Sequence, residues 1–266
     1  MSITLDGRTR LFPLLGDPII YARSPDWLSA RMAERGMNCI SLPMQVPEGK
    51  LDAAMEGLAV TGNVDGVCLT MPHKSDGLRF CETLSETSRL IGVVSAIRRN
   101  PDGSWHGHTT DGDAFVKAQI DNGATIEGKR VLVLGAGGAG SAIAIAMLEH
   151  GAAEVAIHDT DRDRAGRVVA ILADKGGDRV RVADGDPSGF DVVSNATPMG
   201  MDDDDPLPLD PARLDARTFV GDVVAGHGET ALIRAAREAG CGTADGDAMV
   251  VAVLDVMCDF LNGSGG

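Results

Sequence analysis

The 266-residue sequence has few aromatic side chains, a deficit of positive charge and no long apolar run, and each shortage excludes a class of protein. Phe, Trp and Tyr make up only 3% of the residues, which disfavours a surface that stacks on nucleic-acid bases. The 24 basic and 39 acidic side chains give a formal net charge of −15, which repels nucleic acid and anionic lipid. No apolar run approaches the roughly 20 residues that a membrane span needs. We therefore expect neither a nucleic-acid nor a membrane partner.

Cysteine is also scarce and is not arranged for disulfides or zinc. The five cysteines are odd in number and scattered, without a CxxC pair or a Cys/His cluster. They are Cys39, Cys68, Cys81, Cys241 and Cys258. The four acids at 202–205 are typical of a solvated loop, so we expect no metal site. The N-terminus lacks the basic and apolar regions of a secretory signal, and a reducing cytoplasm fits this pattern.

The most informative stretch of the chain is VLVLGAGGAG at residues 131–140. Its four apolar residues predict a buried strand, and residues 141–150 after the glycines predict a helix. Gly135, Gly137 and Gly140 satisfy GxGxxG in this strand–turn–helix context. The motif allows a tight turn, the approach of a pyrophosphate to the backbone, and close packing of helix on strand. The start of the helix then offers unpaired N–H groups to the phosphates, so the stretch predicts a dinucleotide site.

A second half of the same fingerprint follows. Residues 154–159 predict the next strand, which ends in Asp159, 24 residues after Gly135 and near the usual spacing for a ribose-binding carboxylate. An ordinary glycine turn with a surface Asp is the alternative. Asp159 can accept from a ribose diol and would repel a 2′-phosphate, so we predict NAD over NADP. NADP stays possible, because Arg162 and Arg164 on the following helix could offset the repulsion.

Strand and helix patterns alternate along the chain, which predicts an α/β protein with mainly parallel sheets. The strands are expected at 10–16, 38–45, 64–71, 93–98, 104–108, 131–134, 154–159, 179–183, 190–195, 219–224 and 241–244. The helices are expected at 25–36, 48–60, beyond Lys74, and at 85–91, 112–122, 141–150, 161–175, 229–239 and 246–262. The chain divides near residue 111 into an N-terminal α/β unit and a Rossmann unit.

Seven motifs, in order and over nearly the whole chain, resemble those of the shikimate dehydrogenase family. They are Gly16–Ile19 with Ser24-Pro25, Thr70–Lys74, Gly92–Ala96, Thr109–Gly112, Gly135–Gly140, Asn195–Gly200, and Asp245-Gly246 with Met249. The resemblance implies a substrate-binding catalytic domain at 1–111, completed by residues 251–266 of the last helix. It also implies a Rossmann domain at 112–250, with NAD(P) in the cleft between the two.

The resemblance further implies hydride transfer between NAD(P) and a secondary hydroxyl or ketone of shikimate, quinate or a related small hydroxy acid. Lys74 and Asp111 match the acid–base pair of the family, which moves the hydroxyl proton. The substrate-binding matches are Ser24, Thr70, Ser95 and Thr110. The cofactor-binding matches are Gly135, Ala136, Gly137, Gly138, Ala139, Asp159, Asn195, Thr197, Val223, Gly246 and Met249. Taken singly, Lys74 is typical of a surface lysine, Asp111 of a turn or helix cap, Ser24 of a cap and Met249 of a core residue.

Five residues depart from the family pattern. Shikimate enzymes have a serine, two asparagines, a glutamine and a tyrosine where this chain has Ala22, Cys68, Ser95, Val253 and Ala225. A site built for a polyhydroxy acid depends on such polar partners. We therefore expect an altered or weaker preference for shikimate.

Two other functions fit part of the pattern. A methylene-tetrahydrofolate-type dehydrogenase would keep the two-domain fold, but the Thr109–Gly112 and Asn195–Gly200 motifs favour the shikimate type. A regulatory protein that binds NAD without turnover would not need Lys74 and Asp111. The sequence leaves the substrate open and predicts a monomer or homodimer.

Overall fold

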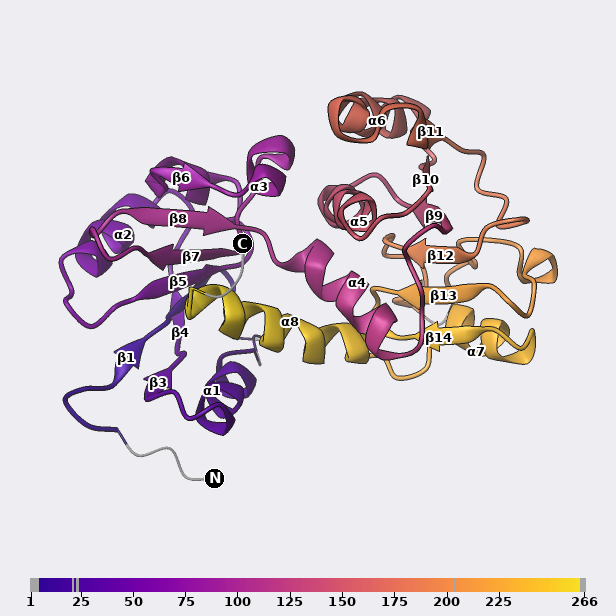
Figure 1. The fold of residues 1–266 in the computed structure, drawn as a ribbon. Helices are drawn as coiled ribbons and strands as arrows, with labels where there is room; N and C mark the ends of the chain where they lie inside the picture. Colours follow the sequence, from indigo (N-terminus) through magenta and orange to yellow (C-terminus); the bar gives the residue numbers. More distant parts are fainter. Residues whose placement is uncertain (1–4, 21, 23, 203, 264–266) are drawn as a thin grey trace. The chain divides into compact units, whose positions relative to one another are not determined.

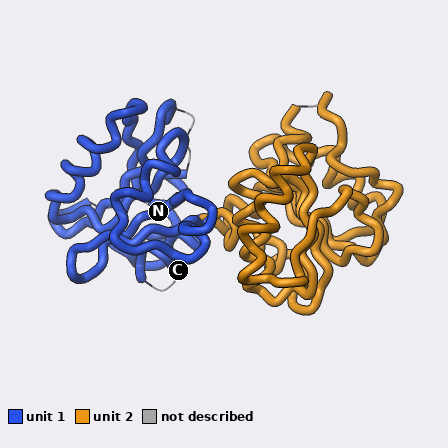
Figure 2. Tube along the Cα trace, turned by 90° about the horizontal axis from the view of Figure 1, so that it is seen from above, with its two compact units in different colours: residues 1–110, 254–266 blue, residues 111–253 orange. Residues whose placement is uncertain are grey.

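A computed structural model describes residues 5–20, 22, 24–202 and 204–263 of the chain (Figure 1). The chain divides into two compact units (Figure 2). Unit 1 comprises the residues up to Thr110 together with those from Leu254 onward, and unit 2 is Asp111–Val253. Strands and helices alternate in both units, so the predicted α/β class is confirmed.

Unit 1 is built on a six-stranded sheet of order β4-β2-β5-β7-β8-β6. Its strands are β2 (Leu14–Gly16), β4 (Pro43–Gln45), β5 (Gly66–Leu69), β6 (Thr83–Leu84), β7 (Ala96–Arg99) and β8 (Trp105–His108). Strands β2, β4 and β5 are parallel, as are β6 and β8, but β7 runs antiparallel to β5 and β8. The sheet is therefore mixed, because the short turn at residues 100–103 reverses the chain between β7 and β8.

Two strands expected to be continuous are broken in unit 1. The first divides into β1 (Arg10–Leu11) and β2, and the second into β3 (Cys39–Ile40) and β4. Strands β1 and β3 pair with each other as a separate two-stranded sheet. Pro13 stands at the first break, and a proline has no N–H group to continue a ladder of hydrogen bonds. The helix expected beyond Lys74 is the short 3-10 helix η1 (Asp76–Phe80).

Three helices of unit 1 surround this sheet: α1 (Ser24–Glu34), α2 (Leu51–Ala59) and α3 (Glu86–Ile91). Helix α1 begins at Ser24-Pro25, as predicted, with the proline in the first turn where its missing N–H costs nothing. The hydroxyl of Ser85 caps α3 by accepting from the N–H of Ser88 at 3.2 Å. Fully buried side chains such as Leu15 and Ile97 form a core between the sheet and α2.

The end of the last helix, α8 (Gly246–Leu261), packs within unit 1. The guanidinium of Arg98 lies over the ring of Phe260 at 4.9 Å and donates to its backbone carbonyl at 3.1 Å. Arg35 on the turn after α1 donates to Asp255 at 2.8 Å and to Asp259. The last helix therefore returns to the first unit, as predicted.

Unit 2 holds a six-stranded, all-parallel sheet of order β11-β10-β9-β12-β13-β14. Its strands are β9 (Arg130–Leu134), β10 (Glu154–His158), β11 (Val180–Val182), β12 (Val192–Asn195), β13 (Phe219–Asp222) and β14 (Gly242–Ala244). Its helices are α4 (Asp111–Asp121), α5 (Gly138–Glu149), α6 (Arg162–Gly176) and α7 (Ala231–Glu238), with 3-10 turns η2 (Gly177–Arg179) and η3 (Pro211–Arg213). Counted from β9, this is the 3-2-1-4-5-6 order of a doubly wound dinucleotide-binding sheet. Figure 1 shows α5 and α6 on one face of the sheet and α7 on the other.

Some predicted features fall partly outside the described residues. Tyr21 and Arg23 of the expected loop before α1 lie outside them, as does Asp203 of the acidic loop. In the described part of that loop, Asp205 accepts from the N–H groups of Gly200 at 3.0 Å and Asp202 at 3.1 Å. Among the described residues, no helix combines the length and the apolar character needed to cross a bilayer.

Candidate functional site

The glycine loop of unit 2 has the close contacts that its motif predicts. Gly135 follows β9 with a φ of 100°, a conformation that side-chain-bearing residues rarely adopt. A Cβ atom on Gly140 would lie 2.8 Å from the carbonyl carbon of Gly135, so only glycine lets α5 approach the strand this closely. Helix α5 begins at Gly138, three residues before the predicted start at Ser141. The motif itself therefore forms the first turn of the helix.

One side of this loop is open. Gly137 and Gly138 are exposed, and no described heavy atom outside their local chain lies within 4 Å of a Cβ built on either. Ala136 is buried and Ala139 is half-buried beside them. Because the first N–H groups of a helix have no partner within the helix, this open turn is suited to phosphate oxygens.

Asp159 lies at the end of β10 with only 7% of its side chain exposed. Its Oδ2 accepts from the N–H of Ala136 at 2.8 Å, and its Oδ1 accepts from the N–H of Asp161 at 2.8 Å. Burial raises the pKa of Asp159, but these two N–H groups and the charge of Arg164 more than offset it and hold the pKa below its usual value. The carboxylate is therefore ionised and keeps lone pairs beyond the two already used.

Residues from four neighbouring strands meet at the carboxyl edge of the sheet in unit 2. Register pairs Leu134 with His158 and with Asn195, and Asn195 with Asp222, so the residues that follow these strands come together. Five of the predicted cofactor residues lie at this edge, namely Gly135, Asp159, Asn195, Thr197 and Val223. The N–H of Val223 donates to the carbonyl of Asn195 at 3.1 Å, which joins the two loops. This edge is where a doubly wound sheet binds its ligand.

The remaining predicted cofactor residues, Gly246 and Met249, begin α8. A Cβ on Gly246 would lie 2.5 Å from the backbone nitrogen of Ala225, so the start of the helix packs closely against the loop after β13. Met249 is half-buried in the first turns of the helix. The glycine allows this approach because a larger residue would push the loop away.

In unit 1 the structure brings together Ser95, Thr110 and the backbone of Lys74. The N–H of Val94 donates to the carbonyl of Lys74 at 2.9 Å. The hydroxyl of Ser95 accepts from the N–H of Thr110 at 2.9 Å and lies 3.0 Å from the hydroxyl of Thr110. Ser95 and Thr110 are 1% and 0% exposed, and Asp111 follows directly as the first residue of α4. The Ser95 hydroxyl thus helps to hold Thr110 in place.

The other two predicted substrate residues lie next to two loops that are joined to each other. The N–H of Asp17 donates to the carbonyl of Met71 at 3.0 Å, so the loop that leads to Ser24 is attached to the turn that follows Thr70. Both Ser24 and Thr70 are half-buried. Burial raises the pKa of the nearby Cys68 thiol to about 12, so this side chain stays neutral.

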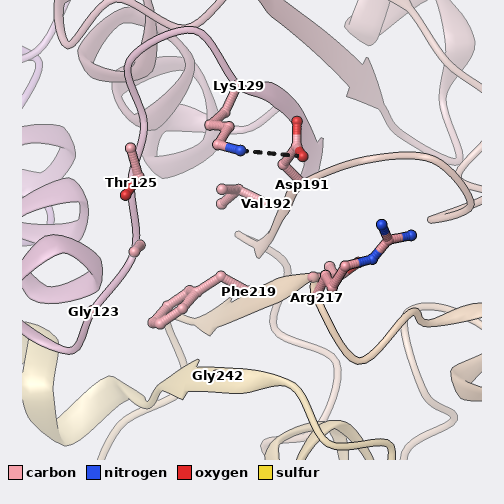
Figure 3. Close-up of a pocket in the computed structure, with 10 residues that line it drawn as sticks. Gly123, Thr125, Lys129, Asp191, Val192, Arg217, Phe219 and Gly242 are labelled. Carbon is pink, nitrogen blue, oxygen red and sulfur yellow. Dashed lines mark ion pairs between the residues drawn. The ribbon is translucent and has the colours of Figure 1, made fainter.

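A cavity of about 280 Å³ in unit 2 lies elsewhere, at the amino ends of β12, β13 and β14 (Figure 3). The described residues lining it are Gly123, Ala124, Thr125, Lys129, Asp191, Val192, Arg217, Thr218, Phe219 and Gly242, and they include none of the predicted site residues. Lys129 pairs with Asp191 at 3.6 Å across it, and Arg217 pairs with Asp215 at 3.0 Å. Its charged side chains already have ion-pair partners, so we assign the candidate site to the opposite, carboxyl edge.

The sheet order, the glycine loop and the acid after β10 define an α/β protein of the dinucleotide-binding class. The family model for the shikimate dehydrogenase substrate binding domain matches residues 14–97. The chain is 36% identical over 254 residues to shikimate dehydrogenase (NADP(+)) of Rubrobacter xylanophilus, covering 93% of this chain and 88% of that relative. The chain belongs to the shikimate dehydrogenase family, and the predicted resemblance is confirmed.

Two solved structures share this fold over nearly the whole chain. The ligand-free 5-ketofructose reductase of a Gluconobacter strain is 28% identical with a TM-score of 0.89, covering 97% of this chain and 94% of its own. Shikimate 5-dehydrogenase of Listeria monocytogenes, in complex with shikimate and NAD, is 26% identical with a TM-score of 0.89, covering 99% and 95%. The two neighbours carry different names at equal structural similarity, so the fold alone does not select a substrate.

Proposed function

We propose that the protein is an NAD(P)-dependent oxidoreductase that transfers a hydride between the cofactor and a secondary hydroxyl or ketone of shikimate, quinate or a related small hydroxylated molecule. The observation that carries this proposal is the Ser95–Thr110 hydrogen-bond pair. It joins the segment bonded to Lys74 to the segment that leads into Asp111. A chain that only sensed NAD would not need Lys74 and Asp111.

The nicotinamide supplies or accepts the hydride when the cofactor is bound. Removing a hydride from a secondary alcohol also requires the hydroxyl proton to leave, and we assign that proton to Lys74 and Asp111. In the reverse direction, an ammonium beside a carboxylate polarises the carbonyl oxygen and returns the proton to it. Thr70 and Ser24 are the hydroxyls that we assign to orienting the substrate.

An activity screen with two variants tests the proposal. The purified protein is mixed with NAD or NADP and with shikimate, quinate, their amino analogues and hydroxy acids without a ring, and NAD(P)H is followed by absorbance. Lys74→Ala and Asp111→Asn should each lower kcat by about 10²–10⁴-fold, the usual contribution of a positioned acid or base, with little change in cofactor Kd. Cofactor binding without turnover of any substrate, unaffected by Lys74→Ala, supports the regulatory alternative instead.

We assign NAD as the preferred cofactor because of Asp159. Its carboxylate is ionised, keeps free lone pairs for a ribose diol and repels a 2′-phosphate. Arg164 opposes this repulsion, since its Nη1 lies 3.6 Å from Oδ2 of Asp159. The Listeria neighbour is named as a complex with NAD, whereas the Rubrobacter relative is named for NADP(+). Asp159 is therefore the residue at which the preference should be tested.

Asp159→Asn should lower the NAD-to-NADP ratio of kcat/KM by about tenfold, because it removes one charge close to the 2′-oxygen. Asp174→Asn is the matched control, since it removes the same charge from an exposed position further along α6 and should leave the ratio unchanged. An unchanged ratio for Asp159→Asn contradicts the assignment.

A second candidate substrate class is a hydroxylated ketone other than that of the shikimate pair. Two of the departing positions support an altered preference for shikimate, because the Ser95 hydroxyl is bonded to Thr110 and Cys68 is a neutral buried thiol. The neighbour named 5-ketofructose reductase makes such a ketone the first addition to the screen. A kcat/KM for shikimate as high as that of a biosynthetic shikimate dehydrogenase contradicts the altered preference.

The cytoplasmic location and the choice between monomer and homodimer stay predictions from the sequence. Light scattering on the purified protein over a range of concentrations tests the oligomeric state.

A further inference from the structure

Asp222 is a buried carboxyl group at the carboxyl edge of the sheet that sequence reasoning did not assign to the site. It is the last residue of β13 and is 0% exposed. Burial raises the pKa of Asp222, while hydrogen bonds from Thr230, Val224 and Asn195 oppose the rise. A carboxylate is retained in such a place only when it has partners, because its burial is otherwise unfavourable.

Three segments of unit 2 donate to this carboxylate. Oδ1 accepts from Nδ2 of Asn195 at 2.9 Å and from the N–H of Val224 at 3.2 Å. Oδ2 accepts from the hydroxyl of Thr230 at 2.7 Å. That hydroxyl in turn accepts from the N–H of Ile233 as the cap of α7, so its proton points at Asp222. Asp222 thus ties the end of β12, the loop after β13 and the start of α7 to one point.

The link to Asn195 determines which way the buried amide faces. With Nδ2 directed at Asp222 and at the carbonyl of Met199, 3.3 Å away, Oδ1 of Asn195 accepts from the N–H of Thr197 at 3.1 Å and from its hydroxyl at 2.7 Å. If the side-chain amide of Asn195 were rotated by half a turn, its NH₂ group would face the N–H of Thr197 and its oxygen would face the carboxylate of Asp222. The acceptor on Asp222 excludes that arrangement.

The loop oriented in this way lies directly against the glycine loop. A Cβ on Gly135 would lie 2.9 Å from the carbonyl oxygen of Ala196 and 3.0 Å from Cγ2 of Thr197. The two loops are packed closely against each other, so a movement of the Asn195–Thr197 segment would also displace Gly135. The glycine turn is the part of the fold suited to the pyrophosphate.

We propose that Asp222 is a positioning residue for dinucleotide binding, which acts through the Asn195 amide to hold the Thr197 loop against the glycine loop. This inference rests on the proposed function, because it assumes that the glycine loop binds a dinucleotide. Asp222 itself contacts neither substrate nor the reacting atoms in this role.

Three variants of the full chain separate positioning from charge and from general stability. Asp222→Ala removes the acceptor and should raise the Kd for NADH by about tenfold, since a buried donor loses its partner. Asp222→Asn keeps an acceptor for Asn195 and Val224 and should restore the Kd to within about threefold of wild type. Thr218→Val removes a buried hydroxyl that donates to Phe190 at 3.0 Å at the amino end of the same strands. This control should lower the Tm and leave the Kd for NADH unchanged.

A double-mutant cycle tests the route through the amide. Once Asn195→Ala is present, adding Asp222→Ala should change the Kd for NADH by less than about twofold, because the carboxylate acts through that side chain. In steady-state kinetics the cofactor KM should rise while kcat falls by a smaller factor. Independent, multiplicative effects of the two changes overturn the proposal, as does wild-type affinity in Asp222→Ala.

If Asp222→Ala does not fold, two substitutions at Thr197 test the hydrogen bonds that run from Asp222 through Asn195 to Thr197. Thr197 is half-buried, at the outer end of this series. Thr197→Val removes the hydroxyl bonded to Asn195 and should raise the Kd for NADH, whereas Thr197→Ser keeps the hydroxyl and should not. Equal affinities for the two variants overturn the proposal. Failure of the proposed function is distinguishable in the wild-type protein. Binding of NADH without turnover of any substrate refutes the oxidoreductase and leaves the positioning role to be tested by these variants, whereas binding of neither NADH nor NADPH refutes both.

Discussion

The packing of α5 on β9 leads to a sharp prediction for two glycines that both lie inside helices. Gly140 in α5 faces the backbone of Gly135, where a Cβ would lie 2.8 Å from the carbonyl carbon. Gly166 in α6 has no described heavy atom within 4 Å of the same built atom, apart from its local chain. Gly140→Ala and Gly166→Ala therefore make the same chemical change in opposite surroundings.

The size of the difference follows from two opposing effects. Replacing glycine by alanine inside a helix stabilises it by about 1 kcal/mol, and both variants gain this. A Cβ on Gly140 would lie closer still to the carbonyl oxygen of Gly135 than to its carbonyl carbon, so Gly140→Ala must displace the helix or strain the turn. Overpacking of this kind costs about 3 kcal/mol at the upper end of its usual range. We expect a net loss of about 2 kcal/mol for Gly140→Ala and a gain of about 1 kcal/mol for Gly166→Ala.

Thermal unfolding measures the change in stability of each variant, and NADH titration measures the change in cofactor affinity. At about 2–4 °C per kcal/mol for a chain of this size, the Tm should fall by about 4–8 °C for Gly140→Ala and rise by about 2–4 °C for Gly166→Ala. Displacing the helix start should also weaken NADH binding in the first variant and not in the second. Equal Tm values, or equal NADH affinity in two folded variants, would refute the reasoning from close packing.

Two further predictions follow from titratable groups whose pKa is shifted by burial. Burial, Arg98 and His108 lower the pKa of His106 from 6.5. The free energy of unfolding should therefore fall as the pH drops below about 6.5 and through the lower pKa of the folded state. In urea unfolding at pH 5–8, His106→Gln should weaken this pH dependence, and an unchanged dependence contradicts the prediction. Burial raises the pKa of every cysteine thiol, to about 12 for Cys68 and about 11 for Cys258. Iodoacetamide at pH 7.5 should therefore label the native protein far more slowly than the urea-unfolded protein, with mass spectrometry as the readout, and rapid native labelling would refute this.

Local sequence predicted the elements of unit 2 well, because its strands are short apolar runs bounded by turns. The apolar run at 131–134 is buried in β9, and the polar end of the next run places Asp159 after β10. Unit 1 was predicted less well. The separate pairing of β1 with β3 and the antiparallel pairing of β7 with β5 depend on which strand lies beside which, and hydrophobic pattern does not carry that information.

The same division holds within the candidate site. The GxGxxG motif can be recognised from the sequence because its glycines are required by local geometry. Gly135 has a positive φ, and Gly140 contacts Gly135, only five residues away in the chain. Asp222 and Asn195 lie 27 residues apart, and only the parallel register of β12 and β13 sets them side by side. No spacing rule marks such a pair, although a polar residue at the end of a buried strand is a signal that could have found Asp222.

The sequence by itself determined the α/β class, the dinucleotide motif, the seven family motifs and the five departures from them. Each of these depends on residue identity or on neighbours close along the chain. The tertiary structure decided the 3-2-1-4-5-6 strand order, the hydrogen bonds between Ser95 and Thr110, and the network centred on Asp222. The physical reason is that hydrogen bonds between distant segments form only after the sheets have paired and the core has excluded water, and such bonds decide which polar groups stay free for a ligand.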